Sequence, residues 1–182
     1  MSNRRLAYTF LLLFILSPLL FSAEVDVFFS PGGRCTEHIA TAIDHAERTI
    51  FVAAYQLSDE TIAEALLNAT KRNVSVAIIA DRTQTSPTYS KVPSLAVAGL
   101  PVFIDTGHRI FHHKFMVIDA KIVITGSYNF TASAATRNAE NLLVIRDEKI
   151  AELYLANWMR CRIQARPFYQ QETARQSRFR GR

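Results

Sequence analysis

The chain has 182 residues, of which 49% are hydrophobic and 20% are charged, and its formal net charge is +5. This composition is typical of a folded globular protein and argues against a disordered chain. The length suits one domain with one sizeable core.

Residues 1–23 differ from the rest of the chain. Arg4 and Arg5 precede an almost wholly apolar run over residues 6–20. This order is typical of a secretory signal peptide, and the run is short for a membrane span, which needs about 20 residues. Phe21 stands where cleavage prefers a small residue, so an uncleaved N-terminal anchor is the alternative. In both cases we expect the remaining chain to be exported, periplasmic or secreted.

The exported part is expected to be one domain over residues 24–165 with a basic tail over residues 166–182. Without Arg4 and Arg5 the formal net charge falls from +5 to +3. Four arginines fall within the last eight residues, namely Arg175, Arg178, Arg180 and Arg182. Such a run can bind phosphates by counterion release, or can be a solvated terminus.

Strand-like and helix-like segments alternate after residue 23. Strands are predicted over residues 25–29, 49–55, 74–80 and 101–104. Helices are predicted over residues 36–46 and 148–164. Two further helices are predicted between these strands: one is capped by Ser58, and a short one ends at residue 98. A polar loop is predicted over residues 81–93, and residues 111–145 are rich in strand signals. The early β-α-β-α-β order predicts an α/β fold: a single domain with a mixed β-sheet sandwiched between helices.

A hairpin is predicted from two strand-like runs, 115–118 and 122–125, which a short polar break separates. In that register Ile118 faces Ile122, Lys114 faces Gly126 and His112 faces Tyr128. Because alternate residues of a strand share a face, His112 and Lys114 point the same way, and Ser127 and Asn129 also share a face.

The hairpin therefore gathers an imidazole, an ammonium, a hydroxyl and an amide at one end of an apolar scaffold. This set suits the transfer of an anionic phosphoryl group. A neutral imidazole such as that of His112 can attack phosphorus near pH 7. Lys114, Ser127 and Asn129 can then stabilise charge on the non-bridging oxygens.

The same residues carry a resemblance to the phospholipase D superfamily. Its pattern is H-x-K-x4-D followed by G-S-x-N, matched here by His112, Lys114, Asp119, Gly126, Ser127 and Asn129. Phe29-Ser30-Pro31, residues 126–131 and Asn138-Ala139-Glu140-Asn141 are similar to the small single-motif bacterial nucleases. The resemblance covers most of residues 24–165 and implies the phospholipase D-like fold.

The resemblance also implies a mechanism. His112 would attack phosphorus to form a phosphohistidine, and a second histidine would protonate the leaving alcohol and then activate water. Because the chain has one motif, that second histidine would come from His112 of a partner subunit in a two-fold homodimer. Glu140 matches the acid that orients the histidine ring, and Asp119, at the hairpin turn, is expected to act structurally. No metal ion or other cofactor is expected.

Other residues have weaker claims to a role. Tyr128 could stack on a base, and Arg82 and Lys91 could line a substrate groove. A zinc site built from His108, His112, His113 and a cysteine is disfavoured, because Lys114 would lie beside the cation. His113 falls on the opposite strand face from His112 and is expected to pack or face solvent.

Two cysteines, Cys35 and Cys161, fall on the first and last predicted helices. In an oxidising compartment they could form a disulfide that closes a long loop, and we expect this bridge.

The expected function is an exported, metal-independent, sequence-nonspecific endonuclease that acts on DNA, with RNA as a second substrate. One alternative is a phospholipase D-type lipid phosphodiesterase. Another is a non-catalytic nucleic-acid-binding module, against which the complete motif argues. A membrane would be a partner only if the N-terminal segment were uncleaved.

Overall fold

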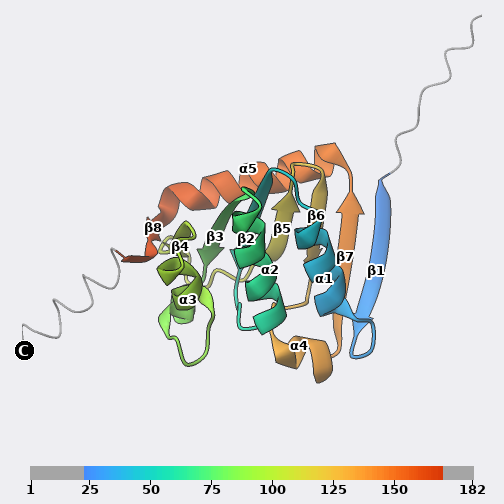
Figure 1. Ribbon diagram of the computed structural model, residues 1–182, viewed down its shortest axis with the longest axis horizontal. Helices are drawn as coiled ribbons and strands as arrows, with labels where there is room; N and C mark the ends of the chain where they lie inside the picture. The colour runs from blue at the N-terminus through green and yellow to red at the C-terminus, as the bar shows by residue number, and fades with distance from the viewer. Residues whose placement is uncertain (1–22, 170–182) are drawn as a thin grey trace, which may run out of the picture.

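The computed structural model describes residues 23–169 (Figure 1). The predicted signal segment, up to residue 22, and the four tail arginines from Arg175 to Arg182 lie outside the described residues.

The centre of the fold is a mixed eight-stranded sheet with the order β1-β7-β6-β5-β2-β3-β4-β8. Strands β2, β3 and β4 run parallel, and the other neighbouring pairs are antiparallel. The strands are β1 (Glu24–Ser30), β2 (Thr49–Ala54), β3 (Ser75–Ala80), β4 (Val102–Asp105), β5 (Lys114–Ile118), β6 (Ile122–Gly126), β7 (Glu140–Arg146) and β8 (Ala165–Pro167).

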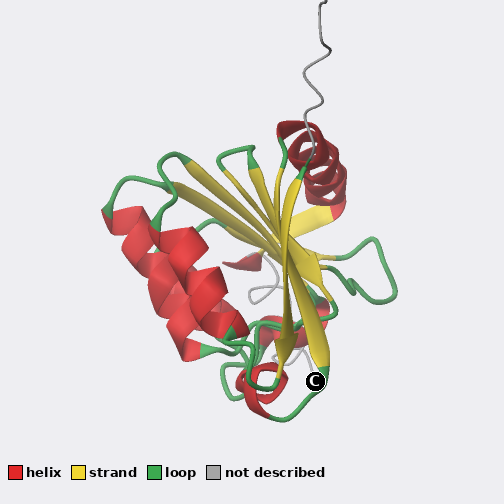
Figure 2. Cartoon of the chain, turned by 90° about the vertical axis from the view of Figure 1, so that its right-hand side faces the viewer, coloured by secondary structure: helices red, strands yellow, loops and turns green. Residues whose placement is uncertain are grey.

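Helices cover both faces of this sheet, which confirms the predicted α/β fold. Figure 2 shows α1 and α2 on one side of the twisted sheet and α5 on the other. The helices are α1 (Cys35–Asp44), α2 (Glu60–Lys71), α3 (Val92–Val97), α4 (Ala132–Thr136) and α5 (Glu148–Gln164), with a 3-10 turn η1 (Arg82–Thr85) after β3. Within residues 23–169, none of these helices is long and apolar enough to cross a bilayer.

The helix boundaries lie close to the predicted ones, but the capping residue of α2 differs. The side chain of Asp59 accepts a hydrogen bond from the backbone N–H of Ile62, so Asp59 is the N-cap and the prediction of Ser58 is wrong. Both residue types cap well. The predicted apolar stripe of α2 faces the core, with Ile62 and Leu66 fully buried.

Each face of the sheet has its own cluster of buried side chains. Cys35 of α1 belongs to one cluster and Cys161 of α5 belongs to the other. Both cysteines are buried and free. The predicted disulfide is therefore wrong, because the sheet lies between the two thiols.

The predicted hairpin is confirmed, and its register holds from Ile118–Ile122 to Phe115–Thr125, whereas the predicted pairs Lys114–Gly126 and His112–Tyr128 lie beyond the ladder. Ile118 pairs with Ile122, and Phe115 pairs with Thr125. Asp119 and Ala120 turn the chain with φ angles of 53° and 54°, in the left-handed region, which aspartate tolerates better than most residues.

The carboxylate of Asp119 ties this turn to the start of β2. It accepts hydrogen bonds from the backbone N–H groups of Glu47, Arg48 and Thr49, at 2.9, 2.8 and 2.8 Å. Burial alone would raise the pKa of Asp119, but these three N–H groups together hold the pKa below its usual value. Asp119 thus fixes the end of the hairpin that lies away from His112.

Asp119→Ala is expected to lower the free energy of unfolding by about 2 kcal/mol, because three backbone donors lose a charged acceptor. Since the folded pKa is depressed, the stabilisation is present above the unfolded pKa of about 4 and is lost as the pH falls through the folded value. Urea unfolding of wild type and variant at pH 7 and in acid measures both effects. A difference in stability that stayed constant down to pH 2 would contradict this assignment.

Candidate active site

The residues of the predicted motif, apart from Asp119, gather at one edge of the sheet. Lys114, the first residue of β5, pairs with Ala54 at the end of β2, and Ala54 pairs with Ala80 at the end of β3. The carboxyl ends of parallel strands are where open α/β sheets usually bind ligands. The site therefore lies where this architecture favours one.

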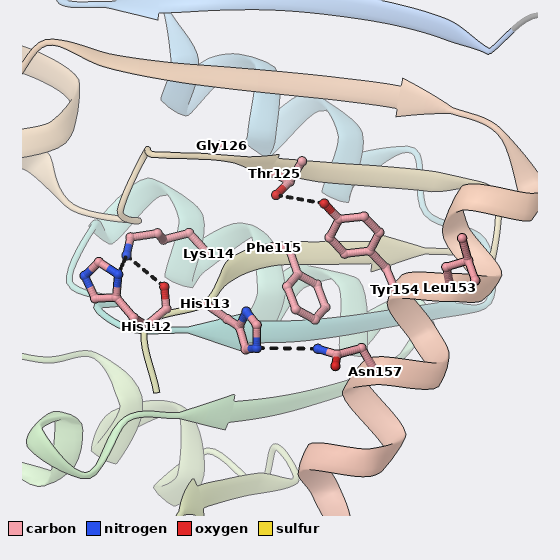
Figure 3. Close-up of a pocket in the computed structure, with 9 residues that line it drawn as sticks. All are labelled: His112, His113, Lys114, Phe115, Thr125, Gly126, Leu153, Tyr154 and Asn157. Carbon is pink, nitrogen blue, oxygen red and sulfur yellow. Dashed lines mark hydrogen bonds between the residues drawn. The ribbon is translucent and has the colours of Figure 1, made fainter. Parts of the chain in front are cut away.

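His112 and Lys114 contact each other, as their two-residue spacing predicts. The Nζ atom of Lys114 lies 2.9 Å from His112 Nδ1 and donates to the His112 carbonyl oxygen, also at 2.9 Å. Figure 3 shows the two side chains turned toward each other at the rim of a cavity. Burial lowers the pKa of Lys114, and the nearby Glu140 carboxylate partly opposes this shift.

Tyr55 contacts both His112 and Lys114, although the sequence analysis did not predict a role for it. Its ring centroid lies 4.5 Å from that of His112, and Lys114 Nζ lies over the ring at 5.0 Å from the centroid. The Tyr55 backbone N–H also donates to the carbonyl oxygen of His113 at 2.7 Å. Only the pairing of β2 with β5 brings Tyr55 here, so no local pattern could have revealed it.

Ser127 and Glu140 form a second group at the same edge. Ser127 Oγ donates to Glu140 Oε2 at 2.6 Å, and Asn138 Nδ2 donates to Glu140 Oε1 at 3.0 Å. Ser127 Oγ also accepts from the backbone N–H of Asn141. Within the described chain, neither Glu140 oxygen bonds to His112, so the expected ring-orienting contact is not made inside one subunit.

Asn129 lies two residues after Ser127 and has an unpaired side-chain oxygen. Its Oδ1 atom is buried and has no hydrogen-bond partner among the described residues. Buried polar atoms are normally paired, so an unpaired one calls for an explanation.

The loop that carries His112 is anchored from several sides. Asp81 accepts from the backbone N–H of Phe111 at 2.8 Å, and Asp105 accepts from that of His108 at 3.0 Å. Arg82 donates to the carbonyl oxygen of Arg109 at 2.7 Å. These contacts give Arg82 a structural task, and it does not line the cavity.

Three other predicted positions do not face the site. Tyr128 is 1% exposed and its hydroxyl contacts Thr36 Oγ1 at 2.8 Å, so the prediction that it stacks on a base is wrong. Tyr128 belongs to the same buried cluster as Ile124, so it stays on the core-facing side of this segment. Lys91 pairs with Glu60 and does not line the cavity, and Asp119 lies at the opposite end of the hairpin.

A cavity of about 420 Å³ opens beside His112 and Lys114. It runs between β5, β6 and α5, and Figure 3 shows its wall. The lining residues are His112, His113, Lys114, Phe115, Thr125, Gly126, Leu153, Tyr154 and Asn157. None of these residues is acidic, so the cavity can admit an anion.

Residues 23–169 bring together no group of three histidine, cysteine, aspartate or glutamate side chains that could hold an ion. His108 instead contacts Asp105, with Nδ1 at 3.1 Å from Oδ1, and Cys35 and Cys161 are buried elsewhere.

Comparison with known proteins identifies the chain's relatives. The model of the family described as "Cardiolipin synthase, PLD-like domain" matches residues 39–161. A protein named phospholipase D from Rickettsia felis is 46% identical over 140 residues, which cover 77% of this chain and 70% of that protein. The mitochondrial cardiolipin hydrolase of Xenopus laevis is 35% identical over 60% of this chain and 52% of its own length.

A solved structure shares the fold almost throughout. Nuc from Salmonella typhimurium, described as a phospholipase D family member, superposes with a TM-score of 0.75 and 35% sequence identity. The match covers 80% of this chain and 98% of that structure.

Tyr55→Leu is expected to lower the pKa of Lys114 further, because leucine is still apolar but lacks the ring face that stabilises the ammonium by about 0.5–1 kcal/mol. Tyr55→Phe keeps the ring and should leave the pKa where it is. NMR titration of lysine labelled at Cε measures both. Equal titration curves for wild type and Tyr55→Leu would show that the ring has no such effect.

Proposed function

Because the chain belongs to the phospholipase D superfamily of phosphodiesterases, we propose that it is an exported, metal-independent endonuclease that hydrolyses DNA without sequence preference. RNA is a second candidate substrate. The observation that carries the proposal is the contact between His112 Nδ1 and Lys114 Nζ at the mouth of a cavity without acidic residues. A nucleophile and a cation at such a mouth suit a phosphodiester anion.

The contact between the two side chains also suggests how substrate prepares the site. A charged Lys114 that donates to His112 Nδ1 leaves the proton of a neutral ring on Nε2. That tautomer has no free lone pair on Nε2 with which to attack. An arriving phosphate competes for the ammonium of Lys114, so the ring proton can move to Nδ1 and free Nε2.

Two balanced steps then complete the reaction. First, a bond forms between His112 Nε2 and phosphorus while the bond from phosphorus to the leaving oxygen breaks. His112 of the partner subunit supplies the proton to that oxygen. Next, the same partner histidine takes a proton from water, whose oxygen attacks phosphorus and releases His112. Lys114, Ser127 and the side-chain Nδ2–H of Asn129 would stabilise the non-bridging oxygens.

An exposed apolar stripe supports the homodimer that this mechanism needs. Val25, Val27 and Phe29 alternate along the edge strand β1, with exposed fractions of 44%, 50% and 64%. Alternate residues share a face, so the three side chains form one continuous apolar strip. Exposed patches of this kind mark interaction surfaces, and a second copy of the chain is the proposed partner.

A lipid phosphodiesterase is the second candidate, because relatives carry the names phospholipase D and mitochondrial cardiolipin hydrolase. The resemblance of residues 126–131 and 138–141 to single-motif nucleases favours nucleic acid. Export rests on residues 1–23, which have the order of a signal peptide.

Purified protein without residues 1–23 is expected to nick plasmid DNA in excess EDTA, and His112→Ala should lose at least about 1,000-fold in rate, because the nucleophile is gone. His45→Ala, at the C-cap of α1 and outside the cavity, is the matched control. Gel electrophoresis and a vesicle assay with cardiolipin or phosphatidylcholine give the readout. Head-group release with intact DNA would favour the lipid enzyme, and DNA binding without cleavage a binding module.

If the two subunits share one active site, a His112→Ala subunit should inactivate any wild-type subunit with which it forms a dimer. If wild-type and variant chains are unfolded, mixed in equal amounts and refolded, only about one quarter of the dimers carry two histidines. Nuclease activity should then fall to about one quarter of that of pure wild type at the same total protein concentration. A fall to one half, or light scattering that shows an active monomer, would contradict the shared site.

A further inference from the structure

The cavity extends well past the two reactive side chains, and we propose that its inner part is a subsite for one nucleobase next to the scissile phosphate. This inference rests on the proposed nuclease function and adds a specific contact to it. The inner part is formed by His113, Phe115, Thr125, Tyr154 and Asn157, and we call it the ring subsite.

Aromatic rings make up most of the ring subsite. The ring centroids of His113 and Phe115 lie 5.3 Å apart, and those of Phe115 and Tyr154 lie 5.0 Å apart. Both pairs meet edge to face, at 70° and 76°. Figure 3 shows the three rings in succession between His112 and α5. Bases stack on aromatic side chains whatever their sequence, because every base has a π-face.

Helix α5 supplies the outer wall. Leu153, Tyr154 and Asn157 are spaced so that they lie on one side of the helix, and all three line the cavity. Tyr154 and Asn157 are partly exposed, so solvent or a ligand reaches them.

Polar groups lie between the rings, where a base edge could meet them. The Tyr154 hydroxyl lies 3.5 Å from Thr125 Oγ1, and Asn157 Nδ2 lies 3.4 Å from His113 Nε2. Both distances are long for hydrogen bonds, so these groups are weakly committed. Burial, followed by the charges of His108 and Lys114, lowers the pKa of His113, so its ring is uncharged near neutral pH.

These polar groups favour a base over a lipid chain. An acyl chain would cover the hydroxyls, the amide and the imidazole without pairing them, which costs free energy for each group left unpaired. A base can stack on the rings and also donate and accept at its edge. Lys114, at the mouth of the same cavity, is placed to meet the phosphate that adjoins the base.

The test uses a short oligothymidylate with a single phosphodiester, in which the other linkages are uncharged methylphosphonates. Two further oligonucleotides lack the base on the 5′ or on the 3′ side of that bond. For wild type, kcat/KM should fall about tenfold for one of the two abasic substrates, since one stacked base is lost. The quantity to compare among variants is kcat/KM for the intact oligonucleotide divided by kcat/KM for the abasic oligonucleotide that wild type cleaves more slowly.

In Tyr154→Leu the ratio should fall to near one, because the ring that the base contacts is missing. Tyr154→Phe keeps the ring and should keep the ratio. Ile163→Ala, on the same helix and outside the cavity, is the matched control and should also keep it. Thermal unfolding of all three variants shows whether the fold is intact. The conservative variant distinguishes base recognition from a packing role of Tyr154.

The outcomes separate the inference from the function on which it rests. A wild type that cleaves all three oligonucleotides equally, or a ratio that Tyr154→Leu leaves unchanged, overturns the ring subsite while the nuclease stands. A wild type that cleaves none of them but releases a head group from cardiolipin vesicles overturns both. A ratio that falls to near one in Tyr154→Leu but stays at the wild-type value in Tyr154→Phe and Ile163→Ala supports the inference.

Discussion

The hydrogen-bonded position of β5 between β2 and β6 is the constraint on which the site depends. Pairing with β2 places Lys114 opposite Ala54, which brings Tyr55 under His112 and Lys114. Pairing with β6 brings the segment that carries Ser127 to the same edge. The Asp119 carboxylate fixes the far end of this hairpin, so a shift of one residue there would turn the reactive side chains to the other face.

The parts of the site that could be predicted are those that depend on local spacing. The strand period of two predicts that His112 and Lys114 share a face, and their side chains do contact each other. The same period places His113 on the opposite face, yet His113 lines the same cavity as the other two. The ladder from Ile118–Ile122 to Phe115–Thr125 follows from the apolar pattern and the short turn. The layered α/β fold likewise follows from the order of strand and helix signals.

The parts that could not be predicted depend on contacts between distant segments. Tyr55 lies far from the motif in sequence and reaches it only through the sheet. Tyr128 belongs to the same buried cluster as Ile124, and its hydroxyl reaches Thr36 of α1, which is far away in sequence. Glu140 meets Ser127 and Asn138 because β7 lies beside β6, an arrangement that no local pattern indicates.

The separation of the two thiols by the sheet has a consequence for how the protein is made. Because Cys35 and Cys161 are each sealed into a different half of the core, oxidative folding has no native bridge to form between them. Burial raises the pKa of both thiols, which keeps the reactive thiolate scarce. The described fold is therefore independent of disulfide-forming catalysts and can be produced in a reducing cytoplasm. There, alkylation of Cys35 or Cys161 would report the opening of the buried cluster to which that cysteine belongs.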